Sequence, residues 1–525
     1  MIVYYAMTKF HLLFCLTHNL LKGKKDDTVL ILYSNLSDVE QYRKKILEKK
    51  YFSKVYILNE IEMRNGWKGA TGPDDIESLN YNIECIIHAM ENWLPFNLSE
   101  TNEIYLTNDH WSLGIYCICK KIPYYFYEDG VGMLSKPDYS YELVYKLNKT
   151  HAYLSKYIEA FSKNENVIAK YADLTNQSDG FDDPKAIHYS VTDNLGKLSP
   201  KNQCEILDIF GMEQIHIESD HLAALFTEHF VNMKRLTILQ QYELYAILID
   251  YFVKGFNLVV KPHPNDVHVN YLDIFPEAKM IDRGFPSELL PYCVDKKIIY
   301  GVAACSTAVL GLKKYFNDVI RFDINIEKKY CKFHRYFALF HILKSIRISH
   351  CDICGIEQDI FHNFNKIFNV TTDSSTGYKI VIIDEVEDCC SLHDIDLSLY
   401  DYAIFLSPFD NYSGYETLID TQTKDNFVFL EIEKIKFTNT YLLNDDSEYI
   451  LIYTANFESK QELEGFHIMN KLEHTGAQIN INIISNNDKV KIKFLEAYLD
   501  SANKKIKYYM EREKELLKLI NDDTN

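Results

Sequence analysis

The stretch Asn257-Leu-Val-Val-Lys-Pro-His-Pro264 decides how the rest of the chain is interpreted. Its apolar residues 258–260 predict a buried strand, and the prolines end that strand because each lacks a backbone donor and restricts φ. His263 is thereby held in a stiff turn at the carboxyl end of the strand. In open α/β sheets, ligands bind at that edge. Taken alone, the stretch also fits a strand-ending turn with a surface histidine.

The chain is too long for a single hydrophobic core. It has 525 residues, of which 47% are hydrophobic and 25% charged, as in ordinary soluble globular proteins. Two successive runs of predicted strands alternate with predicted helices, which is typical of parallel sheets covered by helices. The first run comprises 2–6, 29–33, 55–58, 103–107 and 123–127, and the second comprises 222–226, 258–260, 296–301 and 318–323. We therefore predict an α/β fold with two doubly wound, Rossmann-like domains, residues 1–195 and 196–368, facing across a cleft.

Residues 369–525 predict a third, accessory α/β domain that selects the acceptor or forms oligomers. It ends in a long helix from about 489 to 520, whose first half carries six lysines. We expect this helix to dock on its own domain. Homodimerisation and peripheral contact with an anionic membrane surface are the alternatives.

Charge, cysteine usage and motif content exclude several function classes. The formal net charge of −19 argues against a nucleic-acid partner, because phosphate binding needs a clustered basic face. The 12 cysteines are scattered, and residues 1–7 lack the basic start of a signal peptide. No apolar run is long enough to span a bilayer, and no P-loop or dinucleotide fingerprint occurs. We expect a cytoplasmic protein, with peripheral attachment to the inner face of the membrane as an extension of that expectation.

Two adjacent carboxylates follow a strand of the first predicted domain. The strand 123–127 leads into Glu128-Asp129-Gly130-Val131-Gly132, where the glycines let a ligand or another backbone come close. A carboxylate beside another carboxylate tends to have a raised pKa, which suits a general base. A solvated acidic turn is the alternative, and the sequence leaves both Glu128 and Asp129 open as the base.

A third motif follows the predicted strand 296–301 of the second domain. Small residues lead into Ser306-Thr307, and the pattern predicts that a helix begins at Thr307 and runs to Tyr315. Free N–H groups and hydroxyls at such a helix start bind phosphate, although an ordinary helix cap explains the same residues.

Two polar positions nearby have less certain roles. Ser287-Glu288 fits either a helix cap, which we favour, or a contact with a ribose diol. His229, shortly after the strand 222–226, fits either a core histidine, which we favour, or a residue that lines the nucleotide cleft.

Taken together, these motifs resemble a known family. The order Glu128-Asp129-Gly130, Lys261-Pro-His-Pro264 and Ser306-Thr307, with the amino-terminal Ala6-Met-Thr-Lys-Phe-His-Leu-Leu13, resembles the bacterial sialyltransferases of the lipooligosaccharide type, glycosyltransferase family 52. The resemblance covers roughly residues 1–344, and the same short motifs recur in bacterial polysialyltransferases. The chain departs from the family pattern in one respect, because it has Ser306-Thr307 where several relatives have two consecutive serines.

The resemblance implies a B-type glycosyltransferase that uses a CMP-activated sugar donor and a glycan acceptor, with inversion and without a metal or other cofactor. Asp129, or Glu128, would deprotonate the acceptor hydroxyl, and His263 would hydrogen-bond the CMP phosphate and assist its departure as an acid. A phosphate leaving group does need such donors, with a base on the acceptor side. The nucleotide-binding residues that we expect are Lys261, His263, Pro264, Glu288, Ser306 and Thr307.

The expected reaction is transfer of sialic acid from CMP-sialic acid to a hydroxyl of a surface glycan such as capsule or lipooligosaccharide. CMP-Kdo, another CMP-nonulosonate and CDP-glycerol are the alternative donors. A non-catalytic glycan- or nucleotide-binding protein is the alternative from another class.

Overall fold

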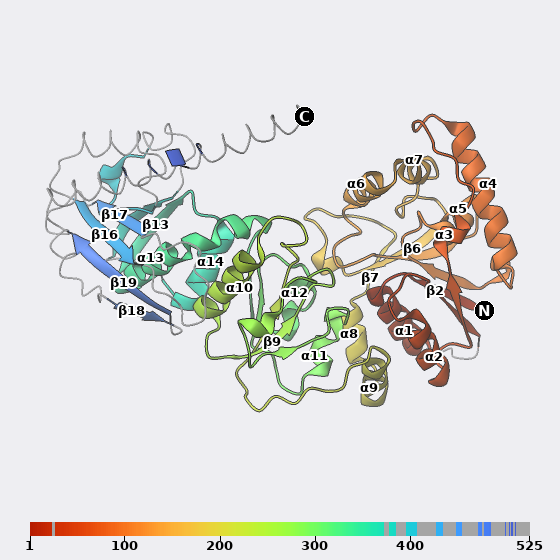
Figure 1. Cartoon of the computed structure of the whole chain (residues 1–525), viewed down its shortest axis with the longest axis horizontal. Coiled ribbons are helices and arrows are strands. Elements are labelled where there is room, and N and C mark those ends of the chain that lie inside the picture. The colour runs from red at the N-terminus through yellow and green to blue at the C-terminus, as the bar shows by residue number, and fades with distance from the viewer. Residues whose placement is uncertain are drawn as a thin grey trace.

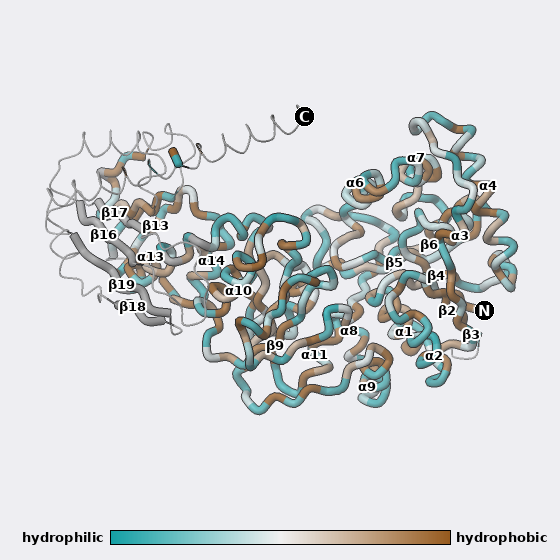
Figure 2. Tube along the Cα trace, in the orientation of Figure 1, coloured by the Kyte–Doolittle hydropathy of each residue, from teal (hydrophilic) through white to brown (hydrophobic). Residues whose placement is uncertain are grey.

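The computed structural model contains three sheets that follow one another along the long axis of the molecule (Figure 1). It describes residues 1–23, 27–371, 377–384 and 395–406, the backbone of four strands between 427 and 484, and the single positions 499, 503, 506, 507 and 510. In the first two sheets, hydrophobic residues follow the strands, and hydrophilic residues follow the outer loops (Figure 2). In the part of the chain so described, no helix is long and apolar enough to cross a membrane.

The first sheet is parallel throughout and has the strand order β3-β2-β1-β4-β5-β6-β7. An order of 3-2-1-4-5-6 is that of the doubly wound dinucleotide-binding fold, so the prediction for this domain is confirmed. Its strands are β1 Ile2–Ala6, β2 Thr28–Tyr33, β3 Lys54–Leu58, β4 Glu103–Leu106, β5 Tyr124–Tyr127, β6 Val167–Ala172 and β7 Ala186–His188. Its helices are α1 Lys9–Lys22, α2 Val39–Glu48, α3 Glu60–Met63, α4 Ile76–Trp93, α5 Ser112–Cys119, α6 Pro137–Leu147 and α7 Lys149–Tyr157.

Helix α1 begins immediately after β1 because the local sequence caps it there. Thr8 is extended and its side chain accepts from the N–H of His11, while the His11 ring accepts from the N–H of Thr8 in return. This reciprocal cap satisfies donors that the first turn would otherwise leave free. It also places the His11 side chain at the carboxyl end of the sheet.

The second sheet is also parallel, with the order β10-β9-β8-β11-β12. Its strands are β8 Leu222–Phe226, β9 Asn257–Lys261, β10 Lys279–Met280, β11 Tyr300–Ala303 and β12 Asp318–Arg321, and its helices are α10 Ile238–Phe252, α11 Leu290–Cys293 and α12 Ala308–Gly311. The strand predicted over 296–301 therefore begins later, at Tyr300.

The helix predicted from Thr307 to Tyr315 is wrong in extent. Helix α12 has only four residues, and a 3₁₀ turn, Lys313–Tyr315, follows it. Gly311 ends α12, where glycine disfavours continuation of a helix. An added Cβ at Gly311 would lie 3.3 Å from Val131, so the first domain packs closely on this end.

Two helices join the first domain to the second. Helices α8 Val191–Gly196 and α9 Pro200–Ile209 contact α1 and α2, respectively. Their buried residues belong to one hydrophobic cluster that includes strand residues of both sheets, among them Leu30 and Ala224. The two parallel sheets thus share a continuous apolar core through this connection, which lies in the region 186–200 and just beyond it.

The third sheet is mixed, with the order β13-β14-β15-β17-β16-β19-β18. Its first three strands are parallel, and the pairings from β15 to β18 are antiparallel. Its strands are β13 Ile348–Cys354, β14 Tyr378–Ile383, β15 Tyr402–Phe405, β16 Phe427–Glu433, β17 Glu448–Tyr453, β18 Lys471–His474 and β19 Ala477–Ile484, preceded or interrupted by α13 Phe333–Ser345 and α14 Gln358–Phe368.

The third sheet begins at Ile348, ahead of the boundary that we predicted at residue 369. The reason is that β13 pairs with β14, and the second and third sheets share a cluster of buried residues that includes Val302, Phe364 and Ile382. The long helix predicted over 489–520 lies outside the described residues apart from the five single positions.

Candidate active site

The carboxyl edges of the first two sheets adjoin. An added Cβ at Gly284 would lie 2.6 Å from Nζ of Lys9, so α1 of the first domain reaches the segment that follows β10. On the same side, the Tyr315 hydroxyl donates to Asp193 at 3.0 Å, and Lys314 forms an ion pair with that carboxylate. The predicted motifs of the two domains therefore lie at one junction.

Asp129 lies at this junction with a buried histidine beside it. His11 Nε2 is 2.7 Å from Asp129 Oδ1, although the angle falls outside that of a regular hydrogen bond. The N–H groups of Met7 and Thr8 donate to the other ring nitrogen, so the proton of a neutral His11 is on Nε2, facing the carboxylate. The Asp129 side chain is 39% exposed and His11 is fully buried. One side of the carboxylate is therefore accessible from solvent, and the other side contacts the buried imidazole.

Glu128 has a different environment from Asp129. Its carboxylate is buried and accepts from the N–H of Asp173 at 2.8 Å and from the Gln177 amide at 2.9 Å. Burial raises the pKa of Glu128 to about 7, and Asp129 is not among the causes. The pKa of Glu128 is thus raised, as we expected, but burial raises it rather than the adjacent Asp129 carboxylate. The geometry gives Glu128 the role of fixing the loop after β6 and leaves Asp129 open to substrate.

Gly132 is required by the backbone of this loop. Its φ is 80°, in the left-handed region, and an added Cβ would lie 2.5 Å from the carbonyl oxygen of Asn176. The loop after β5 consequently packs directly on the loop after β6, and this contact fixes the direction in which Asp129 leaves the strand.

A buried network of hydrogen bonds holds the backbone of the His263 turn in place. Asp266 is 2% exposed and accepts from the hydroxyls of Thr227 and Tyr271, while Thr227 Oγ1 accepts from the N–H of His263. The N–H of Asn265 donates to His263 Nδ1, so the neutral ring carries its proton on Nε2. The turn thus presents one ring donor in a fixed position.

His229 lies against His263 and is part of the site, contrary to its interpretation as a core histidine. The two rings stack, with centroids 4.1 Å apart and an interplanar angle of 18°. Burial lowers the pKa of both imidazoles, and that of His263 falls to about 4, with smaller effects from His229 and Lys261. Both rings are therefore neutral near pH 7 when no anion is bound.

A metal ion fits this pair poorly as it is arranged. Potential ligand atoms of Glu228, His229 and His263 lie within 4.8 Å of one another. A metal must lie in the plane of each imidazole that binds it, and nearly parallel stacked rings have separate planes. One ring would have to rotate before a single ion could bind both, whereas two neighbouring N–H donors suit an anion without rearrangement.

Lys261 is less available than the sequence suggested. Its Nζ donates to the carbonyl oxygens of Pro262 and Arg283 at 2.7 and 2.9 Å, and burial lowers its pKa to about 8. Glu288 is near enough to favour the ammonium, and its own pKa is raised by burial. Lys261 therefore ties two loops together, while Pro264 is exposed beyond the histidine.

The Ser306-Thr307 motif does not sit on a regular helix start. Ser306 is buried and its hydroxyl bonds to Glu228, Thr307 is exposed, and neither caps the four-residue α12 through its side chain. Arg321 donates to the carbonyl oxygens of Cys305 and Ser306 at 2.9 and 3.1 Å, which fixes this segment. The predicted phosphate site at a helix amino terminus is thus reduced to a single exposed threonine beside the histidine pair.

Three residues that shape the site were not assigned a role from the sequence. His11 lay within the quoted amino-terminal motif, and its position directly after a strand was a usable signal. Asp266 and Arg321 gave no such signal, because a carboxylate in a turn and an arginine ending a strand are common in solvated surfaces.

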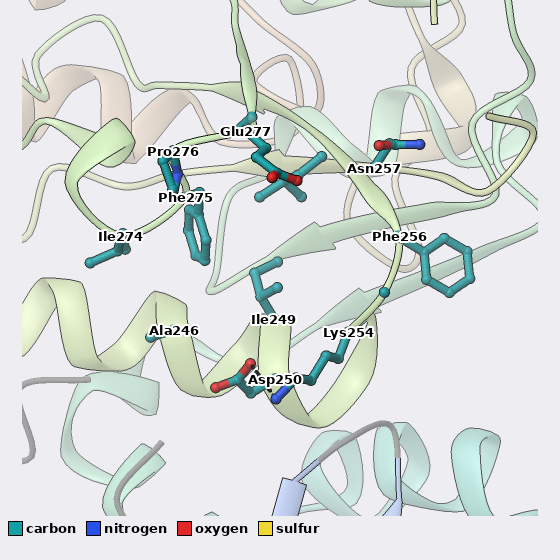
Figure 3. A pocket seen from close by; sticks show the side chains of 13 residues that line it. Ala246, Ile249, Asp250, Lys254, Phe256, Asn257, Ile274, Phe275, Pro276 and Glu277 are labelled. Carbon is teal, nitrogen blue, oxygen red and sulfur yellow. Dashed lines mark ion pairs between the residues drawn. The ribbon is translucent and has the colours of Figure 1, made fainter. Parts of the chain in front are cut away.

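One pronounced pocket lies away from this junction. It is formed at the amino-terminal end of β9, between the end of α10 and the segment 274–278 (Figure 3). Asp250 and Lys254 form an ion pair at 3.7 Å on its wall. Because the His263 turn is at the other end of β9, this pocket is not part of the site described above.

Comparison with known proteins places the central region in a class of glycosyltransferases. Residues 77–325 match the model of glycosyltransferase family 52. The matched region contains Asp129, His263 and Ser306, so the predicted family resemblance is confirmed where these motifs lie.

The relatives found are distant. A protein of Haemophilus influenzae (strain ATCC 51907 / DSM 11121 / KW20 / Rd), described as uncharacterized, is 27% identical over 208 residues, which is 39% of this chain and 64% of that relative. The match therefore spans less than two thirds of the relative's own length.

Two solved structures are among those that match the structure of this chain. The Methanocaldococcus jannaschii UDP-GlcNAc 2-epimerase in complex with UDP-GlcNAc and UDP is 11% identical with a TM-score of 0.35, covering 61% of this chain and 83% of that chain. A ugt transferase from Siraitia grosvenorii in complex with UDP is 10% identical with a TM-score of 0.30, covering 64% and 82%. The fold assignment rests on the strand order given above.

Proposed function

We propose that the protein is an inverting glycosyltransferase that moves sialic acid from CMP-sialic acid to a hydroxyl of a surface glycan. The observation that carries this proposal is the pairing of an accessible carboxylate, Asp129, with the buried His11 at the carboxyl edge of the first sheet. The second domain supplies a fixed imidazole donor, His263, at the carboxyl end of β9. The match of residues 77–325 to glycosyltransferase family 52 supports the same reaction class.

In the proposed mechanism, Asp129 accepts the proton of the acceptor hydroxyl as its oxygen attacks the anomeric carbon of the donor sugar. The bond from that carbon to the CMP phosphate breaks on the opposite face, which inverts the configuration. The transition state resembles an oxocarbenium ion, and its phosphate gains negative charge. His263 Nε2–H, beside His229, donates to that phosphate, and the gain in charge favours protonation of the ring.

The remaining residues orient these groups. Glu128 holds the loop after β6, and Lys261 holds the turn against the segment that follows β10. In this proposal, Glu288 accepts from the ribose hydroxyls of CMP. Thr307, at the exposed end of the Ser306-Thr307 motif, adds a hydroxyl donor for the phosphate. Each of these roles adds positioning rather than a covalent step.

Isothermal calorimetry with CMP, CDP, UDP and GDP tests the nucleotide site. We expect CMP to bind most tightly and His263→Ala to weaken its binding about 10- to 150-fold, the value of one hydrogen bond to a charged group. His268→Ala is the matched control, because His268 is exposed on the same loop. A preference for UDP or GDP would refute the CMP donor.

Turnover of CMP-sialic acid with a glycan acceptor tests the chemistry. Release of CMP and a sialylated product by the wild type, lost in Asp129→Asn, is the expected result. CMP-Kdo and CDP-glycerol serve as competing donors in the same assay. Nucleotide binding without turnover of any of these donors would instead support a non-catalytic binding protein.

A further inference from the structure

An arginine and two aromatic rings form a surface at the carboxyl edge of the first sheet, separate from the residues used so far. We call it the Arg64 platform and define it as Tyr33, Arg64 and Trp111, which come from the ends of β2, the loop after α3 and the loop after β4. The Arg64 guanidinium carbon lies 4.5 Å from the centroid of the Trp111 ring, and the Tyr33 and Trp111 rings are 5.8 Å apart. All three side chains are half-buried, so each has a face open to solvent.

Arg64 is held by backbone and ring contacts and forms no ion pair with a carboxylate among the residues that the structure describes. Its Nε donates to the carbonyl oxygen of Glu60 at 3.1 Å, and the Trp67 ring lies on another side at 5.8 Å. The Glu60 carboxylate accepts instead from the Tyr5 hydroxyl at 2.8 Å and from Ser112. The Arg64 charge acts on the buried Glu60 carboxylate and lowers its pKa against the larger, opposite effect of burial, but the two groups form no ion pair.

The platform connects to the proposed base through the loop after β4. Asn108 and His110 of this loop line the same cavity as Asp129. The His110 ring lies 5.9 Å from the Trp111 ring, and its Nδ1 is buried without a hydrogen-bond partner. The loop after β4 therefore joins the platform to the cavity that Asp129 lines.

Guanidinium groups bind carboxylates and phosphates through two parallel N–H···O contacts, and a stacked guanidinium keeps that edge oriented. The Tyr33 and Trp111 rings offer flat apolar faces, which suit the apolar faces of sugars in mostly aromatic pockets. We propose that the Arg64 platform binds an anionic group, a carboxylate or a phosphate, on the glycan acceptor. This inference rests on the proposed function, since it names the acceptor class for the same site.

Tryptophan fluorescence provides a direct test, because the chain has three tryptophans and two of them, Trp67 and Trp111, contact Arg64. The wild type is titrated with lactose, sialyllactose and lactose 1-phosphate. We expect at least tenfold tighter binding of one or both charged sugars than of lactose, and the two charged arms tell a carboxylate site from a phosphate site. Equal affinities for all three sugars would overturn the proposal.

Variants of Arg64 give the second readout. Arg64→Ala should remove the preference for charged sugars, and Arg64→Lys should retain only part of it because an ammonium cannot form the paired contact. Arg43→Ala is the control, since Arg43 is an exposed arginine on α2 that pairs with Glu40. If Arg64→Ala has a lowered melting temperature, the sugar preference of Arg64→Lys is used instead to judge the proposal. Retention of the full preference in both Arg64 variants would sink the idea.

The failure of this inference can be told apart from failure of the proposed function. CMP binding measured by calorimetry does not involve the Arg64 platform, so it should be the same in Arg64→Ala and the wild type. A wild type that binds CMP and ignores acceptor charge refutes only the platform. A wild type that prefers charged sugars but binds no CMP refutes only the proposed donor.

Discussion

The contact between His11 and Asp129 leads to a prediction in which two substitutions at one position have opposite effects. The Nδ1 side of the ring accepts from two backbone N–H groups and caps α1, while the Nε2 side faces Asp129. An asparagine oxygen occupies about the place of Nδ1 and preserves the cap but does not reach Asp129. A glutamine amide nitrogen occupies about the place of Nε2 and preserves the contact with Asp129 but not the cap.

The expected magnitudes follow from the groups that each variant leaves unpaired. His11→Asn removes the Nε2–H that faces the Asp129 carboxylate at 2.7 Å. If this contact becomes a regular hydrogen bond in the transition state, its loss costs about 1.5–3 kcal/mol, which corresponds to a roughly 10- to 150-fold loss of kcat. His11→Gln leaves two backbone donors of a buried turn without an acceptor, which costs about 1–3 kcal/mol of folding free energy for each group.

Steady-state transfer kinetics and urea unfolding measure the two effects separately. His11→Asn should lose kcat and keep most of its stability, and His11→Gln should lose stability and keep more of its kcat. If His11→Asn retains wild-type kcat in a preparation where Asp129→Asn is inactive, the imidazole does not assist the base and the reasoning is refuted.

Three further predictions concern the carboxylates, the buried histidines and the loop after β5. Asp129→Asn should lower kcat by roughly 10²–10⁴-fold, the usual contribution of a general base, while Glu128→Gln should mainly lower the melting temperature; equal losses of kcat would contradict this division. The pKa of His151 is lowered by burial to about 4, so protons bind the unfolded chain first as the pH falls below about 6.5. This group should therefore not lower the free energy of unfolding above pH 6.5, and should lower it by about 3 kcal/mol as the pH falls to 4. In urea unfolding, the free energy of unfolding of His151→Gln should depend less steeply on pH than that of the wild type. Gly132→Ala should destabilise by about 1–3 kcal/mol in thermal unfolding and reduce transfer, because its φ of 80° and the Asn176 carbonyl oppose a side chain, whereas Gly72→Ala, in open space, should be neutral.

The two parallel sheets could be predicted from the sequence because their signals are local. Apolar strands such as 2–6 and 222–226 are followed by helices with clear caps, and that alternation predicts parallel sheets covered by helices. The extent of α12 was misjudged although Gly311 was a local signal for its end, and the packing of Val131 from another domain on that residue was not visible in the sequence. The start of the third sheet at Ile348 was missed for a similar reason, since its pairing with β14 joins segments on either side of α14.

In the candidate site too, some features could be predicted from the local sequence and others depended on tertiary contacts. The sequence by itself determined that Asp129 and His263 follow strands, since strand ends, prolines and glycines act through the backbone of the residues beside them. Only the tertiary structure distinguished Glu128 from Asp129, bound Lys261 to two carbonyl groups and stacked His229 on His263. Those outcomes depend on burial and on partners from distant segments, and no pattern of neighbouring residues contains that information.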